Sequence, residues 1–207
     1  MLFRSAFLEI TAPLAGGMRL ERHVAVLRRQ RIVLLADAVK PAASDAGVDA
    51  LAVRSALTLA AGLEAEPAAE TREVLVYDGD MRLLALPPAL PEWRGVGPGG
   101  LAVHDGRLVL EQIGRRRLYA PLWLDCDPRR IGRPLTWRQL TVADTRRNLP
   151  PHQAAGFRVQ AGSEQWLLYR ALDVSRNRSL LGCNVSSEFL LGRVKRSGEV
   201  ARTIEIE

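Results

Sequence analysis

The sequence has few of the residues that most often build cross-linked folds and familiar sites. Its 207 residues include 2 cysteines and 3 histidines, and only 5% are aromatic. Cys126 and Cys183 lie far apart without a CxxC spacing, which leaves a zinc knuckle unsupported and a disulfide open. No apolar run reaches the roughly 18 residues that span a bilayer, so we expect no membrane segment. The N-terminal apolar stretch contains Arg4 and lacks the long hydrophobic region of a signal peptide.

Short catalytic motifs are also missing. No serine stands in a GxSxG frame, and there is neither a P-loop nor a GxGxxG sequence that opens a helix. His104 precedes an Asp-Gly turn, and His152 follows two prolines in a loop. A single loop histidine is more often solvated than catalytic, so neither residue identifies an active site.

Arginine, by contrast, is abundant. The chain has a formal net charge of +6, and Lys40 and Lys195 are its only lysines. Arginine binds carboxylates, sulfates and phosphates through paired hydrogen bonds, which suits an acidic polysaccharide or a nucleic acid. A GC-rich genome favours arginine codons over lysine codons, and this bias alone would give the same excess of arginine. A nucleic-acid site is unlikely unless the arginines at 115–117, 129–130 and 146–147 share one face, because arginine beside turns is ordinarily a solvated rim.

Alternating apolar runs bounded by turn residues predict β-strands along the whole chain. Asp-Gly pairs at 78–79 and 105–106 mark hairpin turns, as do glycines 162 and 198. Residues 51–63 fit a helix by their alanine and leucine content and a strand by their alternation, and the neighbouring strands favour a strand. About a dozen short strands predict an all-β fold, a large, supersandwich-like antiparallel β-sandwich that forms a single domain over residues 1–207.

Residues 18–39 predict a β-hairpin with a buried second strand. If the turn is centred on Gln30, His23 faces Asp37, and Leu27 faces Val33. Glu21 lies on the same strand face as His23 by the period of two. Two functions fit this pair: a structural His–Asp hydrogen bond, which we favour, and a metal site such as zinc, for which His23 and Asp37 are two ligands and Glu21 is the candidate third.

This hairpin resembles the one in the β-sandwich of heparinase II/III-like polysaccharide lyases. A histidine on one strand, a basic and apolar run, a tight turn and an apolar strand ending in aspartate carry the resemblance. Later segments such as ETREVLVYDG and LTWRQLTVAD resemble the C-terminal region of uncharacterised heparinase-like proteins. The family joins a helical toroid to the sandwich, so the resemblance implies that this chain is the C-terminal part of a longer protein or a sandwich that stands alone.

The resemblance matches His23 and Asp37 to two metal ligands of the family and departs from it at two functional positions. Glu21 stands where the family places a catalytic histidine, and Arg54 lies near the position of the third metal ligand. β-Elimination requires a base, an acid and a group that neutralises the uronate carboxylate, and the sequence shows no evident Tyr–His pair. If the chain is an enzyme, the resemblance makes it a polysaccharide lyase that acts by β-elimination.

The expected function is therefore a sandwich module associated with acidic polysaccharide and not catalytic in isolation. Sugar rings stack on exposed aromatic faces, so we expect Trp93, Arg94 and Tyr119 to contact carbohydrate, whereas Trp123, Trp137 and Trp166 lie in strand patterns typical of a core. The expected partners are an acidic polysaccharide and a helical toroid domain or chain. The alternative is a structural or interaction domain that packs against a partner chain, and a third, weaker hypothesis is a nucleic-acid binder that works through the arginine excess.

Overall fold

A computed structural model describes residues 4–43, 50–145 and 147–207 of this protein. Within these residues the strand pairings are antiparallel, and the only helical element is the 3₁₀ turn η1 (Ala15–Gly17). The predicted all-β antiparallel fold is therefore confirmed. No helix in these ranges is both long and apolar enough to cross a bilayer. The expected loop at 44–49 and Arg146 lie outside the described residues.

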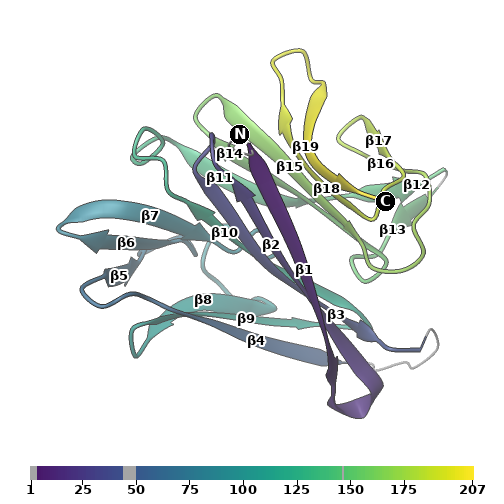
Figure 1. The fold of residues 1–207 in the computed structure, drawn as a ribbon, viewed down its shortest axis with the longest axis horizontal. Coiled ribbons are helices and arrows are strands. Elements are labelled where there is room, and N and C mark those ends of the chain that lie inside the picture. Colours follow the sequence, from purple (N-terminus) through teal and green to yellow (C-terminus); the bar gives the residue numbers. More distant parts are fainter. Residues whose placement is uncertain (1–3, 44–49, 146) are drawn as a thin grey trace.

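Four sheets make up the described fold (Figure 1). The seven-stranded sheet has the order β1-β2-β3-β10-β7-β6-β5, with strands β1 (Ser5–Leu14), β2 (Met18–Leu27), β3 (Ile32–Pro41), β10 (Leu118–Asp125), β7 (Asp80–Leu86), β6 (Val74–Asp78) and β5 (Glu64–Pro67). The five-stranded sheet contains β11 (Leu135–Leu140), β14 (Ala154–Ala161), β15 (Glu164–Ala171), β18 (Phe189–Val194) and β19 (Val200–Ile206). A three-stranded sheet contains β4 (Leu51–Thr58), β9 (Arg107–Gly114) and β8 (Gly99–His104). A four-stranded sheet contains β13 (Arg147–Leu149), β12 (Val142–Asp144), β16 (Arg178–Leu180) and β17 (Cys183–Val185).

The sheets stack in layers, with the seven-stranded sheet covered on both faces. A core that includes Leu34, Trp123, Trp166 and Phe189 lies between this sheet and the five-stranded sheet. A second core joins its other face to the three-stranded β4-β9-β8 sheet, and a third lies between the five-stranded sheet and the four-stranded one. Strand β10 is consequently buried along its whole length, which its apolar sequence LYAPLWLD permits.

Most of the predicted strands and turns are present. Residues 51–58 form β4, and the two Asp-Gly turns join β6 to β7 and β8 to β9. Trp123, Trp137 and Trp166 are at most 2% exposed, as expected for core residues. The segment LTWRQLTVAD is not one continuous strand but divides into β11 and β12, which belong to different sheets. Cys126 and Cys183 are both free thiols.

Candidate functional site

The register of the β2–β3 hairpin differs by one residue from the prediction. Leu27 pairs with Ile32, and Asp37 pairs with Arg22, while His23 stands opposite Ala36. Because neighbouring residues of a strand point to opposite faces, His23 and Asp37 lie on different sides of the sheet. The predicted His23–Asp37 contact is wrong, and so is the metal site that these two residues would have shared.

The cause of the shift is a four-residue turn. Leu27 and Ile32 close it, and the residues between them are Arg28 to Arg31. Arg31 has φ of 52°, in the left-handed region that glycine or asparagine usually occupies. An arginine there gives no signal of the turn type, so the sequence alone did not indicate where the hairpin is centred.

Asp37 belongs instead to the face that packs against the three-stranded sheet. Its carboxylate accepts two hydrogen bonds from the Arg22 guanidinium, at 2.7 and 2.9 Å, and one from the Ser55 hydroxyl. This group borders a cavity of about 140 Å³ with mostly apolar walls between the two sheets. Asp37 is thus fully engaged by a partner on its own sheet and a partner on the layer beneath it.

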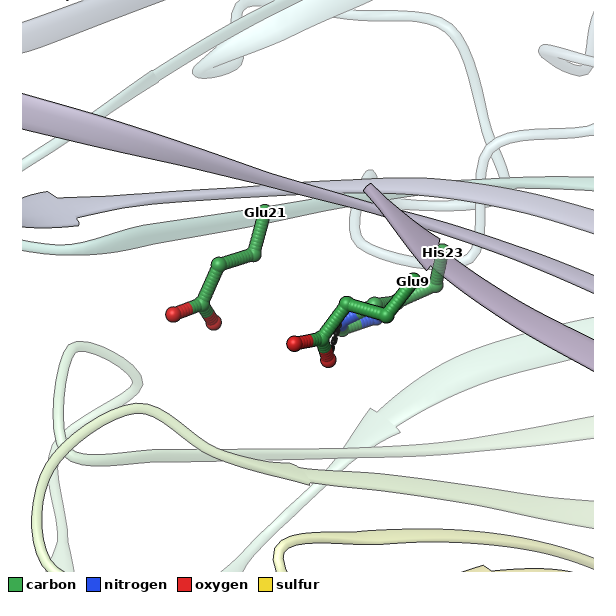
Figure 2. A group of neighbouring side chains, drawn as sticks. All are labelled: Glu9, Glu21 and His23. Atoms are coloured by element: carbon green, nitrogen blue, oxygen red, sulfur yellow. Dashed lines mark ion pairs between the residues drawn. The ribbon is translucent and has the colours of Figure 1, made fainter. Parts of the chain in front are cut away.

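His23 lies on the opposite face, in a polar cluster that also contains the buried Glu21 and Arg170 and the exposed Glu9. Figure 2 shows Glu9, Glu21 and His23 projecting from the β1–β2 pair on the same side of the sheet. Their potential ligand atoms lie within 4.8 Å of one another, which confirms that Glu21 and His23 share a face. The sequence contained a signal for Glu9: a β1–β2 turn centred on Gly16 pairs it with His23. No sequence pattern indicated Arg170, which is distant along the chain.

Arg170 occupies the position that a metal cation would need. Its Nη2 atom lies 2.6 Å from Glu21 Oε2 and 3.8 Å from Glu9 Oε2. Glu21 Oε1 is also held by Lys40 Nζ at 2.8 Å and Arg19 Nη2 at 2.7 Å. Burial acts to raise the pKa of Glu21, but the hydrogen bond and charge of Lys40, followed by those of Arg170, outweigh burial and lower it. Three cations on one carboxylate leave no unbalanced charge to attract zinc, so the cluster does not fit the metal.

His23 is neutral in this cluster. Burial, followed by the positive charge of Arg170, lowers its pKa to about 3. Its Nε2 atom lies 3.0 Å from Glu9 Oε2, but the angle is not that of a hydrogen bond, and Nε2 has no hydrogen-bond partner among the described residues. Its Nδ1 atom lies 3.4 Å from the Tyr119 hydroxyl. The fold therefore brings together a Tyr–His pair that the sequence did not reveal.

This pair is closed to a polysaccharide. Tyr119 is 2% exposed and His23 is 0% exposed, and both pack with Phe189 or Phe157 in the core. Burial raises the pKa of the Tyr119 hydroxyl, so little phenolate is present to act as a base. The prediction that Tyr119 stacks on a sugar ring is wrong, because β10 is covered on both faces and the side chain is almost fully buried. Tyr119 does line one wall of a pocket at the start of β10.

The other two predicted carbohydrate contacts lie in the loop between β7 and β8. Trp93 is 61% exposed, and its carbonyl oxygen accepts a hydrogen bond from Arg72, which also bonds the carbonyls of Pro91 and Gly95. Arg94 Nε donates to the carbonyl of Ala68 at 2.9 Å. The loop is therefore held in place, and it presents the Trp93 ring to solvent.

A second hollow, the cationic pocket, lies at the end of the sandwich where β10 begins. Its volume is about 220 Å³, and its polar lining residues are Gln112, Arg115, Arg117, Tyr119, Gln139 and His152. The remaining lining comes from apolar residues such as Phe157, and from Ala89 and Pro98 of the Trp93 loop. No aspartate or glutamate of the described residues lines the pocket.

The electrostatic character of this pocket is visible at His152. Burial, followed by the positive charges of Arg116 and Arg117, lowers the pKa of its imidazole, whereas Asp173 acts in the opposite direction. Gln112 is only 7% exposed; its Nε2 donates to the carbonyl of Tyr119, and its Oε1 has no partner among the described residues. The pocket thus combines a positive potential with an unused hydrogen-bond acceptor.

Neither the models of known protein families nor the curated protein sequences match this chain. The sequence does not predict the cationic pocket, because its residues come from three separate loops and from strands β9, β10, β11 and β14. For the run of three arginines at 115–117 the sequence predicts only a solvated rim. His152 and Gln112 are brought to it by the fold.

Proposed function

We propose that this chain is a β-sandwich module that binds acidic polysaccharide and is not itself catalytic. The observation that supports this function is the cationic pocket, in which Arg115, Arg117 and His152 surround an apolar wall without a carboxylate. Arginine pairs favourably with a uronate carboxylate or a sulfate. The free Oε1 of Gln112 offers an acceptor for a sugar hydroxyl, since a buried acceptor without a partner carries a desolvation cost that a ligand can relieve.

We expect no catalysis from the Tyr–His pair, because a polysaccharide cannot reach it. β-Elimination needs its base at the proton next to a uronate carboxylate. Tyr119 and His23 are within reach of each other but lie in the core between the sheets. Glu21 occupies the position where the resembled lyases carry their sandwich histidine, and Arg170 binds it there at 2.6 Å. These contacts favour a structural role for the cluster within a heparinase-like module.

The test is a binding titration of the chain with uronate oligosaccharides, with a neutral cello-oligosaccharide as the comparison ligand. The double variant Arg115→Gln/Arg117→Gln should bind the uronates at least tenfold more weakly, because it removes two charge-assisted hydrogen bonds of roughly 1.5–3 kcal/mol each before solvent screening. The double variant Arg107→Gln/Arg138→Gln is the matched control: it removes the same charge from exposed arginines outside the pocket.

Equal losses in the two double variants would mean that net charge and not the pocket binds the sugar. Equal affinity for the neutral oligosaccharide would also contradict the proposal. The same samples should show no rise in the absorbance of an unsaturated uronate, and turnover that disappears in His152→Ala would show that the pocket is catalytic.

A second candidate function, a domain that packs against a partner chain, is favoured by the outer face of β1. Leu8, Ile10 and Leu14 alternate along this edge strand and are 54%, 48% and 41% exposed. A long apolar edge strand without lysine is a site where another chain can pair. The variant Leu8→Lys/Ile10→Lys should abolish such pairing in analytical ultracentrifugation, whereas a monomeric wild-type chain that captures no toroid partner would count against this function.

A further inference from the structure

Segments that are far apart in the sequence meet at the end of the sandwich where β10 ends. The backbone nitrogen of Arg28 donates to the carbonyl of Arg4 at 3.1 Å, and that of Cys126 donates to the carbonyl of Arg31 at 2.8 Å. The β2–β3 turn therefore lies between the start of β1 and the loop that follows β10. Figure 1 shows the β14–β15 and β18–β19 turns at the same end of the molecule as the N-terminus.

Arg130 connects the two large sheets at this end. It is buried, donates to the carbonyl of Gln30 and to Asp125, and lies 3.3 Å from Glu164 Oε2 on β15. The other oxygen of Glu164 lies 2.5 Å from Arg193 on β18. These contacts join the β2–β3 turn, the 126–133 loop, the start of β15 and the end of β18, which leads into the β18–β19 turn.

The charge of these segments is strongly unbalanced. Residue 4 and residues 28–31, 125–133, 161–165 and 193–199 contain ten arginines or lysines and four carboxylates, an excess of six that equals the formal net charge of the chain. All four carboxylates are paired within the group, with Arg129, Arg130, Arg193 or Lys195. Six exposed arginines have no ion-pair partner among the described residues and form what we call the arginine-rich end: Arg4, Arg28, Arg29, Arg31, Arg133 and Arg196.

The arginine-rich end offers a ligand positive charge but no aromatic surface for stacking. No aromatic side chain of these segments is exposed among the described residues; the nearest ring, Trp166, is buried beneath Arg130 at 5.0 Å. Unpaired bases and sugar rings are held largely by stacking on exposed aromatic faces, which this surface does not offer. Duplex nucleic acid needs no such platform, because it carries about one phosphate charge per 1.7 Å on its outside, where arginines on several loop tips can reach it.

We propose that the arginine-rich end binds the phosphate backbone of double-stranded nucleic acid without reading its sequence. The sequence made a nucleic-acid site unlikely unless its arginine clusters shared a face. Residues 115–117 and 129–130 lie at opposite ends of β10, but residues 28–31, which form the β2–β3 turn, contact the 126–133 loop. Phosphate contacts position a duplex and carry no base information. This site is separate from the cationic pocket and does not depend on the proposed function.

The test is fluorescence anisotropy with two unrelated labelled duplexes of about 20 base pairs, over a salt range from about 50 to 200 mM. Each phosphate contact contributes about −0.9 to the slope of log K against log salt, so six contacts should lower the affinity roughly a thousandfold across this range. The variant Arg28→Gln/Arg29→Gln/Arg31→Gln should bind more weakly and reduce the slope by about 2.7. Since these arginines are exposed and unpaired, the melting temperature should not change.

The control Arg107→Gln/Arg115→Gln/Arg117→Gln removes three charges elsewhere and should keep the wild-type affinity and slope for duplex. Equal losses in both triple variants, tighter binding of single strands, or binding of only one of the two duplexes would overturn the proposal. So would the lack of any binding at about 50 mM salt. The uronate titration separates the two sites: the turn variant should keep uronate affinity, whereas the pocket variant should lose it.

Discussion

At the scale of single residues, His23 is the side chain whose protonation the fold alters most clearly. Burial, followed by the charge of Arg170, lowers its pKa to about 3, from the ordinary imidazole value of about 6.5. Below pH 6.5 the His23 imidazole binds a proton in the unfolded chain but not in the folded chain. The stability contributed by the neutral ring is therefore fully present above pH 6.5 and is lost as the pH falls toward 3.

We predict that the free energy of unfolding declines between pH 7 and 4, with up to about 1.4 kcal/mol per pH unit coming from His23. The variant His23→Phe should reduce this decline, because it keeps a ring beside Phe7, Phe189 and Tyr119 but cannot be protonated. Urea denaturation at a series of pH values measures the effect. His104→Gln is the control, since His104 is an exposed turn residue, and identical slopes for wild type and His23→Phe would contradict the assignment.

At the scale of elements, the β2–β3 register decides which side chains act together. Arg22 and Asp37 face each other and form two hydrogen bonds, whereas His23 lies on the other face of the sheet. A double-mutant cycle of Arg22→Ala and Asp37→Ala should therefore give a coupling energy of about 0.5 kcal/mol or more. The cycle of His23→Ala and Asp37→Ala should be additive within about 0.5 kcal/mol by chemical denaturation. The reverse pattern would restore the register predicted from the sequence.

The elements also show which features the sequence makes predictable. Long alternating runs with Asp-Gly or glycine turns gave β6–β9, β14–β15 and β18–β19, because these glycines adopt the positive φ that such turns need. The β2–β3 register failed, since Arg31 takes a left-handed conformation that its side chain does not signal. Strands β5, β13, β16 and β17 have three or four residues and too little alternation to be recognised.

The candidate sites were less predictable than the strands, because they depend on which distant strands and loops come together. Tyr119 was expected to be exposed, but a strand covered on both faces leaves no outward side. The partners of His23 come from β1, β10 and β15, and the cationic pocket comes from three loops and four strands. Sites built by pairing between distant strands depend on topology, which short-range patterns do not specify.

At the scale of the whole molecule, Arg130 connects the two large sheets through ion pairs. Its guanidinium pairs with the buried carboxylates Asp125 and Asp127 and reaches Glu164 on the facing sheet. Arg130→Met should destabilise the fold by about 3–5 kcal/mol, because it leaves the buried Asp125 carboxylate without its counter-charge. Arg129→Gln is the matched control: Arg129 pairs with the same Asp127, but its side chain is 74% exposed, so it should cost less than about 1 kcal/mol in a urea titration. Similar costs for the two variants would mean that Arg130 does not join the sheets.

The layered architecture also predicts how stability is distributed. All eight residues of β10 are buried between two cores, whereas β4 alternates between half-buried and exposed residues at the edge of the outer three-stranded sheet. Local opening of β4 exposes little apolar surface, but opening of β10 disrupts both cores and amounts to global unfolding. Amide hydrogen exchange should therefore be slowest in β3 and β10 and markedly faster in β4 and β8. Equal protection in β4 and β10 would mean that the outer sheet opens only with the whole molecule, and that the layers form one cooperative unit.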